Sequence, residues 1–214
     1  MSATPFGVVT LVAAGLTLGA CAADMPEAPP ATTASPTNAP ATERVVGPLS
    51  PADAEALSTM NERVKQYLAV HLRIEQSLPR LPNDATPEQI DKHQRDFEVK
   101  IREARATAKQ GDIFTAEARP VIIRLLASVF GGPDGRQLKA SIMDENEVNP
   151  VALKLAVNSR YPDSVPLTSI PPQVLQTLPK LIEDLEYRFV GDWLVLLDPH
   201  AHVIADFIEN ALPK

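Results

Sequence analysis

The residues best suited to chemistry in this sequence are two histidines and two aspartates near its C-terminal end. His200 and His202 alternate, and Asp198 and Asp206 flank them. Alternate side chains share one face of a strand, and imidazole with carboxylate is a ligand set that suits Zn²⁺. The two histidines, however, lie in a turn beside Pro199, where their rings can diverge. We therefore expect a solvated turn and neither a metal nor another cofactor, with zinc binding at these four residues as the alternative.

Other catalytic arrangements are incomplete in this chain. It has no Gly-x-Ser-x-Gly or Ser-x-x-Lys motif, and its single cysteine, Cys21, precedes the part expected to fold. The glycine-rich segment 131–135 lacks the Gly-Lys-Ser/Thr and the preceding strand of a phosphate-binding loop. Three neighbouring acids could act as paired carboxylates but are typical of a solvated turn: Asp144, Glu145 and Glu147. We expect no catalytic or cofactor-binding residue.

Cys21 fits lipid attachment better than catalysis. Residues 1–20 carry no charged side chain, and the apolar run Val8–Leu18 is typical of a secretory signal peptide, too short for a comfortable membrane span. The ending Leu18-Gly19-Ala20-Cys21 resembles the bacterial lipobox, in which the cysteine thiol receives a diacylglycerol and becomes the mature N-terminus. The chain departs from that pattern because no Lys or Arg precedes the apolar run. The alternatives are an ordinary signal peptide with an incidental cysteine and an uncleaved anchor.

A linker composition follows this cysteine. Residues 21–49 are rich in alanine, proline and threonine, so they cannot bury a core, and we expect a disordered tether. Ala22 stands where an aspartate would favour inner-membrane retention, so we expect a lipid anchor in the outer membrane, facing the periplasm. The expected division is a signal peptide at 1–20, the tether at 21–49 and one folded domain at 50–214.

Charge and cysteine content exclude several classes of protein. The chain has 20 Lys and Arg against 27 Asp and Glu, for a net charge of −7, and no basic stripe that could neutralise phosphates. This argues against nucleic-acid binding. One cysteine allows neither an intramolecular disulfide nor a cysteine-based metal cage.

The folded domain opens with a predicted helical hairpin over 50–111. Ser50 is an N-cap followed by proline, and Thr86 forms a capping box with Gln89. The first helix carries a stripe with spacings of three and four: Leu57, Met60, Val64, Tyr67, His71, Ile74 and Leu78. The second carries another, with Gly111 as its C-cap: Ile90, Gln94, Phe97, Ile101, Ala104 and Ala108. We expect the helices to pack antiparallel and His71 to be a packed or rim histidine.

Residues 112–148 predict two further helices. Thr115 can cap one that runs to about Phe130 with a wide apolar face, and Arg136–Glu145 predicts a shorter one. From residue 149 the period changes. Apolar alternation over 151–158 predicts a strand, and residues 173–178 predict a short helix closed by proline.

The strongest core signal is the run Leu185–Ile208. It reads as three β-branched and aromatic strands with turns at 191–192 and 198–202. Four of its side chains should belong to the sheet, at least two of them against the 121–130 helix: Tyr187, Phe189, Trp193 and Leu196. The predicted class is α+β, with the hairpin and one or two further helices packed on a small, mainly antiparallel sheet of three to four strands.

Several segments carry a resemblance. Tyr161-Pro162, Ile170-Pro171-Pro172 and the Leu-Glu-Tyr-Arg-Phe-Val-Gly … Leu-Val-Leu-Leu-Asp unit that starts at Leu185 resemble an uncharacterised family of bacterial envelope proteins with signal peptides or lipoboxes. Ile90–Phe114 shares the likeness, which covers most of residues 85–210. It implies an envelope location and brings no activity, cofactor or catalytic residue. We expect a non-enzymatic lipoprotein that binds or braces another envelope component, with a periplasmic hydrolase or metal-dependent enzyme as the alternative.

Overall fold

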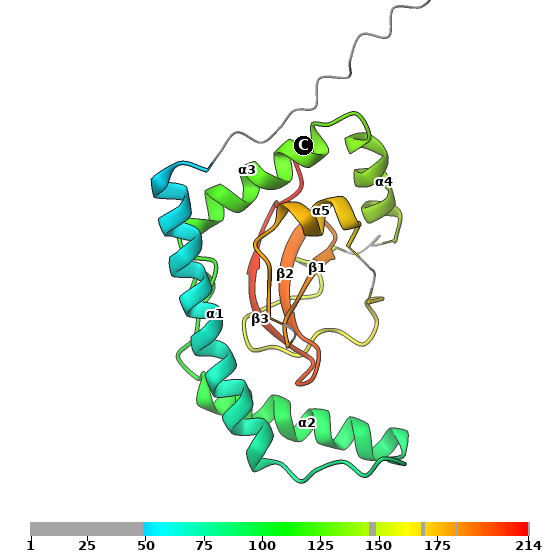
Figure 1. Cartoon of the computed structure of the whole chain (residues 1–214). Helices are drawn as coiled ribbons and strands as arrows, with labels where there is room; N and C mark the ends of the chain where they lie inside the picture. The colour runs from blue at the N-terminus through cyan, green and yellow to red at the C-terminus, as the bar shows by residue number, and fades with distance from the viewer. Residues whose placement is uncertain (1–48, 146–148, 168–169, 183, 214) are drawn as a thin grey trace, which may run out of the picture. The chain divides into compact units, whose positions relative to one another are not determined.

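A three-stranded antiparallel sheet lies at the centre of the fold (Figure 1). The computed structural model describes residues 49–145, 149–167, 170–182 and 184–213. The strands are β1 (Glu186–Val190), β2 (Trp193–Asp198) and β3 (Val203–Ile208), in the order β1-β2-β3. Gly191 has a φ of +57°, which suits the tight turn between the first two strands. The three predicted strands and their two turns are confirmed.

Five helices precede the sheet within the described residues: α1 (Pro51–Ser77), α2 (Pro87–Ala104), α3 (Ala118–Phe130), α4 (Gly135–Glu145) and α5 (Pro172–Thr177). The Ser50 hydroxyl accepts a hydrogen bond from the Asp53 amide at 3.1 Å, and Thr86 and Gln89 form the predicted capping box. The α+β class predicted from the sequence is confirmed. Residues 1–48, which hold the predicted signal peptide and all but the last residue of the predicted tether, lie outside the described residues.

The helices cover one face of the sheet. All seven residues of the predicted α1 stripe are buried, and α3 packs its own apolar face beside them. The rings of Phe130 on α3 and Phe189 on β1 meet at 6.4 Å between centroids. Tyr187 and Leu196 belong to the same hydrophobic cluster as α3, and Phe189 is the predicted side chain with a ring contact to this helix.

The connection between α4 and α5 covers the opposite face. Leu155, Tyr161 and Val165 pack there against alternate side chains of β2 and β3. Trp193 lies on this face and stacks on Phe207 at 4.9 Å. Because both faces are covered, every residue of β2 and β3 is buried.

The strand predicted over 151–158 is wrong. Residues 151–154 form a turn, and Lys154 and Asn158 have φ angles of 53° and 62°, which a strand does not allow. Only the end of the segment pairs with the sheet. The Asn158 amide donates to the Ile204 carbonyl at 2.8 Å, and Arg160 bridges Val203.

Helix α2 also differs from the prediction. It ends at Ala104, and Gly111 lies in the loop beyond with a φ of +91°. Figure 1 shows α2 crossing the C-terminal end of α1 steeply instead of running back beside it. Its Phe97 and Ile101 are buried as expected, but Ile90 is 41% exposed. The chain leaves the helix where the side chain of Arg105 turns toward the sheet and donates to the Ala205 carbonyl.

Candidate functional site

Three ionisable side chains meet where the C-terminal half of α1 faces the turn between β2 and β3. His71 and Glu75 lie one helical turn apart on α1, and His200 comes from the turn. One nitrogen or oxygen atom of each lies within 4.8 Å of the others. His71 is fully buried, whereas the side chains of Glu75 and His200 are 45% and 50% exposed. The cluster therefore joins the core to the surface.

A buried carboxylate orients the inner histidine. Oδ2 of Asp198 lies 2.6 Å from Nδ1 of His71 and accepts a hydrogen bond from the Tyr67 hydroxyl at 2.7 Å. The amide of Ala201 donates to the other oxygen at 2.9 Å. Since a carboxylate accepts, Nδ1 of His71 carries the proton and Nε2 offers a lone pair. Nε2 is buried without a hydrogen-bond partner among the described atoms.

The charges around this network shift the pKa values of His71 and Tyr67. Burial alone would lower the pKa of His71, but the hydrogen bond and charge of Asp198, together with Asp184 and Glu75, outweigh it and raise the pKa. Burial, reinforced by the charge of Asp198, raises the pKa of Tyr67 well above its usual value. Tyr67 is therefore a neutral donor, and the field around His71 is negative.

The local sequence accounts for this arrangement. Tyr67, His71 and Glu75 are spaced by four residues, which places them along one side of α1. Asp198 closes β2 and is followed by Pro199, so the chain turns and presents His200 to the same helix. The rings of His71 and His200 lie 5.6 Å apart.

The four metal candidates named from the sequence do not form one site. His202 has a φ of 54°, and its ring packs edge-on against Tyr161 at 5.9 Å, whereas the His200 ring lies beside His71. Burial and the charge of Arg160 lower the pKa of His202. The divergence of the two rings that the turn suggested is present.

Asp206 is committed to the backbone. Its Oδ1 accepts from the amides of Gly111 and Phe207, and its Oδ2 from those of Ile113 and Phe114, at 2.8–3.0 Å. A β-bulge places it there, because the register passes from Leu196–Asp206 to Leu197–Ile204 and leaves Ala205 as the extra residue. No lone pair is left over for a metal.

Of the three neighbouring acids, Asp144 is exposed near the end of α4, and Glu147 lies outside the described residues. Segment 131–135 connects α3 to α4, as expected for a loop between helices.

Sequence reasoning missed two members of the cluster. The sequence predicts His71 only as a packed or rim histidine of the α1 stripe, and it does not single out Glu75. The signal that could have found them is the His-x-x-x-Glu spacing, which puts an imidazole and a carboxylate on neighbouring turns of one helix.

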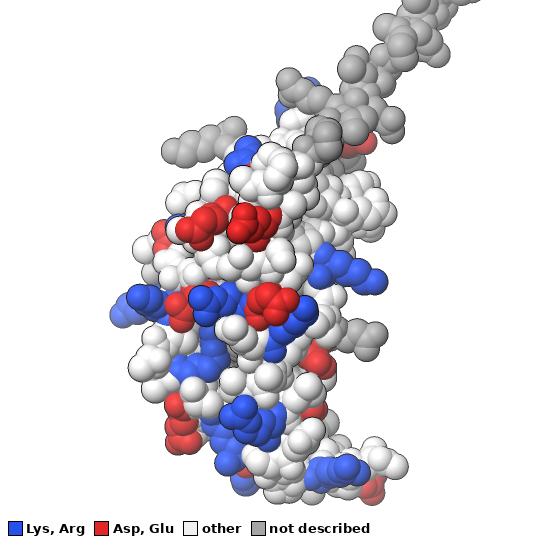
Figure 2. All heavy atoms as spheres, turned by 60° about the vertical axis from the view of Figure 1, so that its left-hand side comes forward, with Lys and Arg blue, Asp and Glu red and all other residues white. Residues whose placement is uncertain are grey.

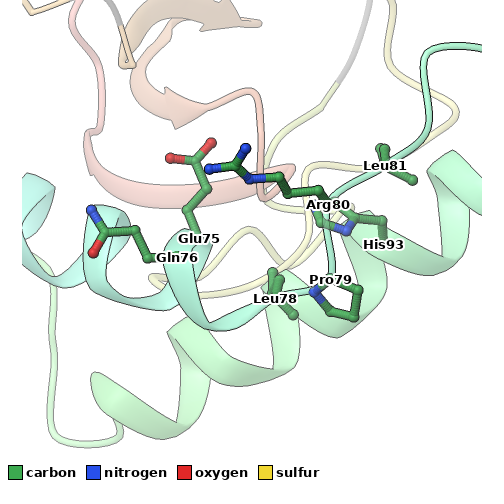
Figure 3. A pocket seen from close by; sticks show the side chains of 7 residues that line it. All are labelled: Glu75, Gln76, Leu78, Pro79, Arg80, Leu81 and His93. Atoms are coloured by element: carbon green, nitrogen blue, oxygen red, sulfur yellow. The ribbon is translucent and has the colours of Figure 1, made fainter.

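A groove of about 620 Å³ opens beside the cluster, at the corner where α1 ends and α2 crosses it. Its lining residues are shown in Figure 3: Glu75, Gln76, Leu78, Pro79, Arg80, Leu81 and His93. In that view the Glu75 carboxylate and the Arg80 guanidinium point toward one another. The cluster is therefore reachable from solvent on its Glu75 side.

The edge strand β1 is a second open feature. β3 is covered at its outer edge by residues 158–161, whereas no backbone hydrogen bond joins the outer edge of β1 to another described segment. The hairpin pairs Val190 with Trp193 across a two-residue turn, so the outward backbone groups are those of Tyr187 and Phe189. A groove of about 290 Å³ lies beside Tyr187, lined by Leu175, Pro179, Lys180, Leu181, Leu185, Glu186, Tyr187 and Arg188.

The described surface gives no further indication of a partner. Figure 2 shows positive and negative side chains interspersed on the face that carries α1. None of the helices in the described ranges is long and apolar enough to span a membrane. Comparisons of the chain with protein-family models, curated proteins and solved structures found no match. The resemblance to envelope proteins stays a prediction.

Proposed function

We propose that this protein is a non-enzymatic envelope lipoprotein, anchored through Cys21, whose folded domain binds an extended segment of another envelope protein. The lipobox-like ending at Cys21 and the proline-rich composition of 22–49 support a lipid-anchored domain facing the periplasm at the outer membrane. They place no constraint on what the domain binds, so the binding mode rests on its surface.

The observation that carries this binding mode is the unpaired edge of β1. An unpaired strand edge presents a row of N–H and C=O groups with the spacing of another strand's main chain. Tyr187 and Phe189 carry these groups, and the hydrophobic packing of both rings holds the strand in place. An added strand would give these groups the hydrogen bonds that no described backbone segment provides, as in the β-augmentation used by many peptide-binding domains.

The adjacent groove supplies side-chain selectivity. Its apolar part includes Leu175, which is 48% exposed although it is a large hydrophobic residue. Lys180 and Arg188 line the same groove together with Glu186. The fitting partner is therefore an extended segment with alternate apolar side chains and at least one acidic residue, since alternate residues of a strand face the same side.

Lipidation is tested separately from binding. The wild-type protein should incorporate a radioactive fatty acid and partition into detergent, and Cys21→Ser should do neither. A wild-type protein that stays in the aqueous phase, with an N-terminus other than Cys21, would contradict the anchor and leave the binding proposal standing.

The edge is tested by cross-linking at the groove. A photo-reactive residue at Leu175 should cross-link to an envelope protein in intact cells, whereas one at Val151, which is 69% exposed elsewhere, should not. A peptide copied from the cross-linked segment should then slow hydrogen exchange of the Tyr187 and Phe189 amides in the purified protein. Leu175→Glu should abolish this protection, and Val151→Glu should keep it. Peptide binding without protection of these two amides would disprove the strand-addition mode.

A further inference from the structure

We propose that His71, Glu75 and His200 form a binding site for one divalent transition-metal ion of the zinc class. The site lies between α1 and the β2–β3 turn and does not depend on the proposed peptide binding at β1. It also differs from the set His200, His202, Asp198 and Asp206 that the sequence suggested, of which only His200 is a ligand here.

The donor set fits the ion. Two imidazole nitrogens and one carboxylate oxygen are the protein ligands of many zinc sites that keep a fourth position open. Ligand atoms around tetrahedral zinc lie about 3.4 Å apart, given bonds of about 2.0–2.1 Å. The three donor atoms here lie within 4.8 Å of one another, so small side-chain rotations close the site. Glu75 and His200 are half-exposed and can rotate, while His71 stays fixed.

The inner ligand is prepared for coordination. Metal-binding histidines almost always donate their other ring N–H to a carboxylate or carbonyl, which fixes the tautomer and the ring orientation. His71 does this to Asp198 at 2.6 Å, and Asp198 is itself held by the Tyr67 hydroxyl and the Ala201 amide. The remaining nitrogen, Nε2, is buried and has no partner among the described atoms. A buried lone pair without a donor is costly unless something binds it.

The surroundings favour a cation and leave it accessible. Asp198, Asp184 and Glu75 all act on His71 as negative charges. Glu75 also lines the groove of about 620 Å³, so a metal held by it has an open coordination position toward solvent. In Figure 3 the Arg80 guanidinium points toward the Glu75 carboxylate.

Titration calorimetry of the full chain in detergent with Zn²⁺ alone tests the site. The expected result is one ion per chain, with affinity reduced by about a hundredfold or more in Glu75→Gln and in His200→Ala. Both residues are half-exposed, so these variants should keep the helical circular-dichroism spectrum. His71 is not used for this test, because its removal would take one of three hydrogen-bond partners from the buried Asp198 carboxylate and change the core.

Two histidines provide matched controls. His202→Ala removes an imidazole two residues from His200, and His93→Ala removes one that lines the adjacent groove. Both variants should bind Zn²⁺ within about twofold of wild type and should give, with Co²⁺, the visible absorption of four-coordinate nitrogen and oxygen ligation. The proposal is overturned if wild type binds no stoichiometric ion, if Glu75→Gln or His200→Ala binds as wild type does, or if His202→Ala loses as much affinity as His200→Ala.

Discussion

Two buried aspartates on neighbouring strands show how the same side chain can serve different ends. Asp206 on β3 accepts from four backbone amides, three of them in the loop after α2. Asp198 at the end of β2 accepts from a tyrosine hydroxyl, a histidine ring and one amide. Both carboxylates are fully buried, so burial alone does not distinguish them.

The two aspartates differ in whether their hydrogen-bond partners keep a second polar atom free. The amides around Asp206 have a single donor each, which the carboxylate uses completely. His71 has two ring nitrogens, and the bond to Asp198 turns the second one into an oriented, buried acceptor. A carboxylate paired with backbone ties a loop to the sheet, whereas one paired with an imidazole can also prepare a ligand. Four experiments can test this distinction between Asp206 and Asp198.

Asp206→Ala should lower the free energy of unfolding by about 4 kcal/mol, because several buried amides lose a charged acceptor at once. Urea denaturation measures the change, and zinc binding by the remaining folded protein should be unaffected. A smaller loss than that caused by Asp198→Ala would break the comparison, since Asp206 would then not be the main structural anchor.

Zinc at one hundred times its dissociation constant should raise the stability of the wild-type protein by about 2.7 kcal/mol. Thermal unfolding with and without the ion measures this shift, and Glu75→Gln should show almost none of it. An equal shift in both proteins would mean that the ion binds elsewhere. Asp198 would then not prepare a metal ligand, and only its structural role would remain.

Tyr67→Phe should cost about 2 kcal/mol, because it removes one buried donor to the charged Asp198 and keeps the aromatic ring. The Arg105 guanidinium lies over the same ring at 4.7 Å from its centroid, and Tyr67→Phe should keep this contact. Chemical denaturation gives the magnitude. If Tyr67→Phe left the stability unchanged, His71 and Ala201 alone would suffice to hold the Asp198 carboxylate.

Gly111→Ala should cost about 1 kcal/mol, since Gly111 adopts a φ of +91° to bring its amide to Asp206. An added Cβ meets open space apart from the Phe114 carbonyl at 3.7 Å, so strain in the backbone is the main effect. The measurement is again urea denaturation. A loss several times larger would mean that backbone strain at Gly111 is not the main effect.

Much of the fold could be predicted because its signals are local. The Ser50 and Thr86 caps, the α1 stripe and the three strands each follow from residues close in sequence. The failures came from long-range contacts. Leu153, Leu155 and Val157 alternate because they pack on the outer face of the sheet, yet the positive φ angles at Lys154 and Asn158 make that segment a coil. An apolar alternation shows which side chains are buried, but it does not show whether the backbone is a strand or a coil.

The candidate metal site was less accessible to sequence reasoning for the same cause. The sequence pairs His200 with His202 as neighbours, but in the structure His200 lies beside His71 and His202 beside Tyr161. His71 lies far along the chain from His200, and only the packing of α1 on the β2–β3 turn brings the two rings together. The helical spacing of His71 and Glu75 is visible in the sequence, but these two residues without His200 do not indicate a metal site.

The position of the sheet at the end of the chain determines when folding can finish. The apolar faces of α1 and α3 contact strands contributed by residues 186–208 of a 214-residue chain. A chain that emerges from its N-terminus therefore exposes these helices before their partners exist, and local helix formation alone is marginal in water. Under the export that we propose, the chain would stay unfolded during translocation, and the core would close only after β3 had crossed the membrane.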